Sequence, residues 1–126
     1  MNDPADQKVV AWVERQPRTS LWTSSITVLE IQLGLESMPA GKRRTRLSQV
    51  FELILEEMDS RIAVFDEEAA RVTASLMASR QKKGRVRDLR DSMIAGVVLA
   101  RNASLATRNT AHFSDVPATV VNPWEA

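Results

Sequence analysis

Residues 88–113, DLRDSMIAGVVLARNASLATRNTAHF, decide the fold because they join a packed helix to the strand that follows it. We expect Asp88 at the helix N-cap, since its carboxylate can accept from the free backbone N–H groups of the first turn. Asp91 then falls in that turn, where the helix dipole favours a negative charge. The helix ends near Asn102, and residues 104–107 predict a buried strand. A carboxylate at a helix start and polar groups after the next strand meet at one edge of a sheet, where open α/β folds bind ligands.

The rest of the chain alternates amphipathic helices with short strands. We expect helices at residues 6–16, 24–37, 42–58 and 66–82, and brief strands at 21–23, 61–65 and 118–121. Strands separated by helices through short connections predict a mostly parallel sheet covered by helices. The strands are few and weak, and nothing strand-like precedes the first helix.

The helix that ends at Ser37 is apolar nearly all round, so we expect it to be largely buried. Glu30 lies inside it. Its neighbours one turn away, Ile26, Leu33 and Gly34, offer no partner for a carboxylate. A charge on such a face is costly unless something compensates it. Two explanations stay open: the side chain reaches the rim and meets solvent or an arginine, or it belongs to a functional site.

Composition limits the possible classes of protein. The 126 residues fit a single domain over residues 1–126, and the apolar fraction of 44% is ordinary for a globular protein. The absence of cysteine excludes a disulfide scaffold, a thiol nucleophile and a thiolate metal site. No apolar run reaches membrane-spanning length and the N-terminus is polar, so we predict no transmembrane helix and no signal peptide. A cytoplasmic protein is expected.

Basic residues cluster although the net charge is only +1. One run holds Lys42, Arg43, Arg44 and Arg46, and the other holds Arg80, Lys82, Lys83, Arg85, Arg87 and Arg90. Such runs can form a phosphate-binding surface when they share a face. The alternative is a pair of solvated helix ends.

Several kinds of catalytic site are missing from the sequence. There is no glycine-rich phosphate loop and no Gly-x-Ser-x-Gly elbow, and the single histidine, His112, excludes a multi-histidine zinc site. What remains is a set of oxygen ligands at Glu30, Asp91, Asn109 and Asp115. Carboxylate and amide oxygens suit Mg²⁺ or Mn²⁺, and such sites carry out phosphoryl chemistry.

Five short blocks bring these residues together in one pattern. They are SITVLEI at 25–31, FDEEAA at 65–70, DSMIA at 91–95, LATRNT at 105–110 and VNPW at 121–124. In this order they resemble the PIN-domain ribonucleases of the VapC toxin type, over nearly the whole chain. The resemblance implies a three-layer α/β/α sandwich with a short, mostly parallel sheet. It also implies an endoribonuclease that depends on Mg²⁺ or Mn²⁺ and serves as the toxin of a toxin–antitoxin system, with RNA as substrate and a small antitoxin and a homodimer as partners.

The resemblance assigns roles to four residues. Glu30 matches the family's helix glutamate and Asp91 its metal-binding aspartate. Asn109 stands where members carry Asp or Asn, so these three residues are the implied metal ligands. Thr107 matches the hydroxyl two residues earlier and completes the implied catalytic set.

Two further polar residues, His112 and Asp115, lie where the family's acidic pattern varies, and we treat them as accessory candidates. The basic side chains expected to steer RNA are Arg43, Arg44, Lys82, Lys83 and Arg108.

One feature of the family has no counterpart in the sequence. Members begin with a strand that carries a Leu-Asp-Thr-Asn motif, whose Asp is the first metal ligand. The domain is therefore expected to be truncated at its N-terminus and to hold the metal weakly. A start codon assigned too far downstream, a trimmed chain or a decayed gene would each account for this. The competing interpretation is a catalytically inactive PIN scaffold that acts as a protein-interaction module.

Overall fold

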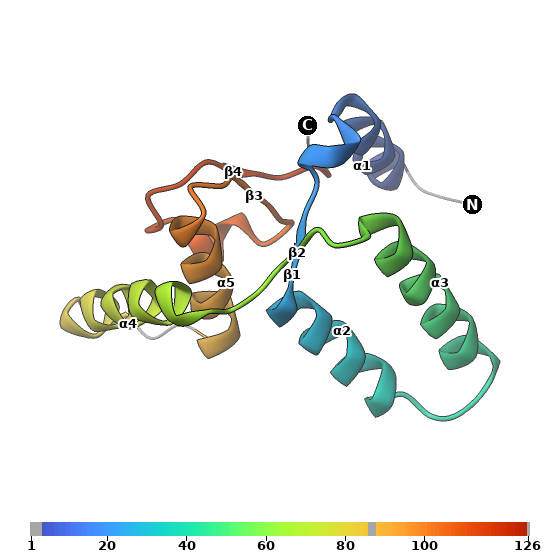
Figure 1. Ribbon diagram of the computed structural model, residues 1–126, viewed down its shortest axis with the longest axis horizontal. Helices are drawn as coiled ribbons and strands as arrows, with labels where there is room; N and C mark the ends of the chain where they lie inside the picture. The colour runs from blue at the N-terminus through green and yellow to red at the C-terminus, as the bar shows by residue number, and fades with distance from the viewer. Residues whose placement is uncertain (1–3, 86–87, 126) are drawn as a thin grey trace.

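The computed structural model describes residues 4–85 and 88–125 (Figure 1). Its α-helices are α1 (Pro4–Arg15), α2 (Ser25–Ser37), α3 (Lys42–Met58), α4 (Glu67–Lys82) and α5 (Leu89–Ala100). The strands are β1 (Thr23–Ser24), β2 (Ile62–Ala63), β3 (Leu105–Ala106) and β4 (Val120–Val121), and two 3₁₀ helices are η1 (Arg18–Ser20) and η2 (Thr110–Phe113). Within the described ranges, no helix combines the length and the apolar character that crossing a membrane requires.

The helix boundaries follow from local capping chemistry, as the sequence predicts. Ser24 and Asp66 each accept a hydrogen bond from the backbone N–H three residues further on, at 3.0 and 2.9 Å. Asp88 accepts from the backbone N–H of Arg90 at 2.8 Å. These bonds satisfy donors that a helix start leaves unpaired. At the other end of α4, Gly84 has φ +67°, a left-handed conformation that terminates the helix.

The strands form two separate parallel pairs. In the first pair Thr23 lies opposite Ile62, and in the second Leu105 lies opposite Val120. The predicted parallel direction is confirmed, but among the described residues the strands make two two-stranded sheets and not one continuous sheet. Residues of both pairs, together with α5, line a cavity of about 730 Å³. The separation between the two strand pairs therefore coincides with a partly open cavity.

Helix α5 is the centre of the core. Val97 packs with Ala63 and Ala69, which come from β2 and α4. Ala95, on another side of α5, packs with Phe113 and with Val116. Helix α5 therefore packs against residues of or near both strand pairs and joins the two pairs through its own core contacts.

The expectation that α2 is largely buried is wrong. Only Ile26 and Leu35 of this helix are buried, whereas Leu29, Ile31 and Leu33 are 50%, 41% and 51% exposed. Figure 1 shows α2 and α3 running side by side away from the α4–α5 unit. Few other elements of the chain are therefore available to cover the apolar side chains of α2. Apolar periodicity reports that a helix face is suited to burial, and it does not say which molecule covers that face.

Candidate active site

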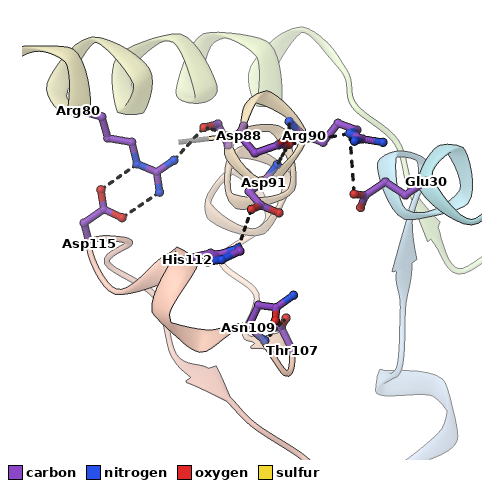
Figure 2. A network of polar contacts seen from close by, with 10 residues as sticks. Glu30, Arg80, Asp88, Arg90, Asp91, Thr107, Asn109, His112 and Asp115 are labelled. Atoms are coloured by element: carbon purple, nitrogen blue, oxygen red, sulfur yellow. Dashed lines mark hydrogen bonds and ion pairs between the residues drawn. The ribbon is translucent and has the colours of Figure 1, made fainter. Parts of the chain in front are cut away.

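A carboxylate and an imidazole meet at the start of α5 (Figure 2). Asp91 lies in the first helical turn, and its Oδ2 is 2.9 Å from Nδ1 of His112 in η2. The side chain of Asp91 is 21% exposed and that of His112 is 54% exposed, so solvent and ligands can reach the pair. The helix N-terminus stabilises the negative charge of Asp91.

Glu30 approaches the same helix end from α2. Its Oε2 lies 3.9 Å from Nε of Arg90, which also lies 3.9 Å from Oδ1 of Asp88. Figure 2 shows Arg90 reaching toward Glu30, while its neighbour Asp91 points toward His112. The charge of Glu30 thus meets an arginine at the rim of the core, with its side chain 35% exposed. Of the two explanations for Glu30, the contact matches the first, in which the side chain reaches the rim and meets an arginine. The same contact places Glu30 beside the start of α5.

Thr107 and Asn109 follow β3 in a fixed turn. The backbone N–H of Thr107 donates to the carbonyl of Val121 at 2.9 Å, which continues the pairing of β3 with β4. Its hydroxyl oxygen accepts from the backbone N–H of Asn109 at 3.2 Å. Asn109 is also the residue at the N-cap of η2, the short helix that carries His112. This turn therefore leads directly into η2, whose His112 contacts Asp91.

Asp115 is engaged elsewhere. Its two carboxylate oxygens accept from Nε and Nη2 of Arg80, both at 2.8 Å, and the two side chains are 10% and 3% exposed. Arg80 is therefore not part of a solvated basic run, which corrects its grouping with Lys82 and Lys83. It lies on the inward face of α4, where a carboxylate compensates its charge.

The basic residues expected to steer RNA do not form one surface. Arg43 and Arg44 lie in the first turn of α3, while Lys82 and Lys83 lie at the end of α4. Figure 1 places these two helix ends on opposite sides of the molecule. Arg108 is between the two turn residues described above, and its guanidinium stacks over the ring of Trp124 at 5.5 Å. Arg87 of the second run lies outside the described residues.

The donor set suits a hard divalent cation in its chemistry. Two carboxylates, from Glu30 and Asp91, and the amide of Asn109 offer the oxygen ligands that Mg²⁺ and Mn²⁺ prefer. In residues 4–85 and 88–125, no group of three or more histidine and acidic side chains is arranged to hold a metal ion. An ion bound here would take few protein ligands and keep water in its shell, as Mg²⁺ commonly does.

Comparisons with known proteins identify the family of this chain. A protein-family model described as PIN domain matches residues 2–118. The chain belongs to the PIN-domain family. It is 39% identical over 121 residues to the VapC ribonuclease Y4jK of Sinorhizobium fredii, with 95% of this chain and 86% of that relative covered. It is 31% identical over 120 residues to Toxin FitB of Neisseria gonorrhoeae, with 94% of this chain and 86% of the relative covered. The crystal structure of FitAcB from Neisseria gonorrhoeae matches with a TM-score of 0.86 at 30% identity, covering 95% of this chain and 87% of that one.

The family assignment confirms the resemblance to VapC-type PIN-domain proteins and the α/β fold class. What the sequence did not reveal in this PIN domain is the pairing of its polar residues. The spacing of Ala69, Thr73, Leu76 and Arg80 is the signal that could have placed Arg80 on the inward face of α4. Nothing comparable predicts its partner, because Asp115 lies 35 residues away in the sequence.

Proposed function

We propose that this PIN-domain chain is the toxin of a toxin–antitoxin pair and hydrolyses RNA phosphodiester bonds as a divalent-metal-dependent endoribonuclease. The family match over residues 2–118 carries the proposal. The name of one relative, VapC ribonuclease Y4jK, supports the ribonuclease activity, and that of another, Toxin FitB, supports the role as a toxin. The comparisons lend no support to the alternative of an inactive scaffold. RNA as substrate agrees with a cytoplasmic location.

In this proposal Glu30, Asp91 and Asn109 hold Mg²⁺ or Mn²⁺. A bound divalent ion supplies positive charge against the phosphate oxygens and makes an associated water more acidic. The contact with His112 Nδ1 fixes the orientation of the Asp91 carboxylate. The Thr107 hydroxyl holds the turn that presents Asn109.

The proposed partners are a small antitoxin and a second copy of the chain. Both come from the resemblance to VapC-type toxins. The exposed apolar side chains of α2 and α3 are compatible with association, since larger apolar patches on a soluble protein commonly mark interaction sites.

A cleavage assay on purified protein tests the proposal. We expect RNA to be cut with Mg²⁺ or Mn²⁺, and cutting to stop with EDTA and in Asp91→Ala. Arg71→Ala is the matched control, because Arg71 forms an exposed ion pair with Glu67 on α4. Cutting that survives both EDTA and Asp91→Ala would contradict the proposal, because it could not come from this site.

A further inference from the structure

Arg80 makes three short side-chain hydrogen bonds in a buried position at the end of α4. The residue is 2% exposed. Besides its paired bonds to Asp115, both at 2.8 Å, its Nη1 donates to Oγ of Ser92 at 2.8 Å. Ser92 is 1% exposed, and its hydroxyl donates onward to the carbonyl of Asp88 at 3.2 Å. Figure 2 shows this guanidinium facing Asp115 and the start of α5.

These bonds connect α4 to two segments of the candidate active site, the start of α5 and the residues that follow η2. Ser92 lies in α5 directly after Asp91. Asp115 lies three residues after His112, just beyond η2. Arg80 itself is anchored, because its backbone carbonyl accepts from the N–H of Arg85 at 2.8 Å. The guanidinium of Arg80 therefore fixes the start of α5, which carries Asp91, relative to η2, which carries His112.

Stability alone does not explain an ion pair at this depth. Burying two charges costs desolvation, and well-packed apolar side chains of similar size usually stabilise a fold as well or better. What a guanidinium adds is geometry, since its donors lie in a rigid plane and bind a carboxylate at two points. In Arg80 a further donor of the same plane binds Ser92.

We infer that Arg80 is a positioning residue, which sets the first turn of α5 and η2 at the spacing that brings His112 Nδ1 within 2.9 Å of Asp91 Oδ2. The positioning is a property of the folded chain. Its meaning for catalysis rests on the proposed function. The two statements are tested by different measurements.

The spacing can be read without RNA and without metal. The chain contains a single histidine, so the imidazole signals in a ¹H–¹⁵N NMR spectrum belong to His112. Asp91→Ala gives the reference spectrum of His112 without its partner. At one fixed pH, we expect the His112 signals of Arg80→Met to move to those of the reference variant, and those of Arg71→Met to stay at the wild-type positions.

The double variant Arg80→Met/Asp115→Leu guards against a failure to fold. It replaces both charges of the Arg80–Asp115 pair by apolar side chains, so neither is left buried without the other, and we expect the variant to fold. Its His112 signals are expected to move as in Arg80→Met. Wild-type signals in a folded Arg80 variant would overturn the inference, and so would the failure of both variants to fold, because Arg80 would then serve folding alone.

Activity is the second readout. We expect Arg80→Met to lower kcat for RNA cutting about 10- to 100-fold with little change in KM, the size of effect seen when a group that orients a metal ligand is lost. Arg80→Lys is not expected to restore it, since an ammonium lacks the planar fork. A wild-type chain that cuts no RNA but shows the shift in Arg80→Met would refute the proposed function and leave the positioning intact.

Discussion

At the scale of single residues, Gly96 decides how closely α4 and α5 pack. A Cβ atom on this residue would lie 1.8 Å from Oγ1 of Thr73 and 2.9 Å from the carbonyl oxygen of Ala69. Thr73 is itself held in place, because its hydroxyl donates to that same carbonyl at 2.7 Å. Glycine is needed here for close approach, since any side chain would have to displace backbone or a bonded hydroxyl.

Gly96→Ala is therefore expected to lower the free energy of unfolding by about 1–3 kcal/mol, the usual effect of overpacking. Gly34→Ala is the matched control, because nothing lies within 4 Å of a Cβ built at that exposed position in α2. There the substitution is expected to stabilise by about 0.5–1 kcal/mol through helix propensity. Urea unfolding of the two variants measures both values. Equal effects of the same sign would contradict the close-approach argument.

The same scale shows what sequence reasoning can find in a site. Glu30 was selected because a charge on an apolar helix is a local anomaly. Asp91 was selected because a carboxylate at a helix start is expected to meet the polar groups after the next strand at one edge of the sheet. The partners of these residues, Arg90 and His112, could not be predicted, since each contact joins segments distant in the chain. Asp115 was selected as an accessory oxygen ligand, and the structure pairs it with a buried arginine. Whether the selected residues bind metal stays a prediction.

At the scale of elements, local signals were sufficient for the helices and insufficient for the sheet. The cap predicted at Asp88 is correct, and Ser24 and Asp66 cap the helices that were expected to begin at those positions, because a cap involves residues within one turn. Each strand has only two residues, and its pairing depends on a partner far along the chain. The division into two sheets could not be predicted, because periodicity says nothing about which strands are neighbours.

The cavity between the strand pairs leads to an element-scale prediction. It is lined by Thr23 and Ser24 of β1, Leu105 and Ala106 of β3, and apolar residues of α5. We expect an extended segment carrying Leu-Asp-Thr-Asn, fused ahead of the chain, to pair with these strands and to raise Tm by a few degrees, since apolar surface is buried. We also expect the Asp of this segment to raise the affinity for Mg²⁺, because it adds a carboxylate ligand. The same segment with Asn in place of Asp should raise Tm equally and should not raise the affinity for Mg²⁺.

Thermal unfolding and Mg²⁺ titration of the two fusions make this comparison. An unchanged Tm in both would show that the cavity does not accept a strand. A gain in Mg²⁺ affinity that is equal in both would show that the added carboxylate does not reach the candidate metal ligands.

At the scale of the whole molecule, α2 and α3 carry apolar side chains that no other part of the described chain fully covers. The exposed side chains are Leu29, Ile31 and Leu33 on α2 and Val50, Leu53 and Ile54 on α3, each at least 41% exposed. Both helices extend from the α4–α5 unit (Figure 1). For α2 the sequence predicts a largely buried helix, and that prediction is wrong for the single chain.

If the proposed homodimer uses these helices, substitutions there separate association from folding. Leu53 is 61% exposed, so Leu53→Lys removes no core contact and is expected to leave the free energy of unfolding of the monomer nearly unchanged. Burying a leucine side chain is worth about 1.5–3 kcal/mol, so we expect self-association to weaken about 10- to 100-fold. Val64→Lys is the control, since Val64 is 51% exposed and lies outside both helices. Sedimentation equilibrium measures the dissociation constants, and equal weakening by the two substitutions would mean that the copies associate through another surface.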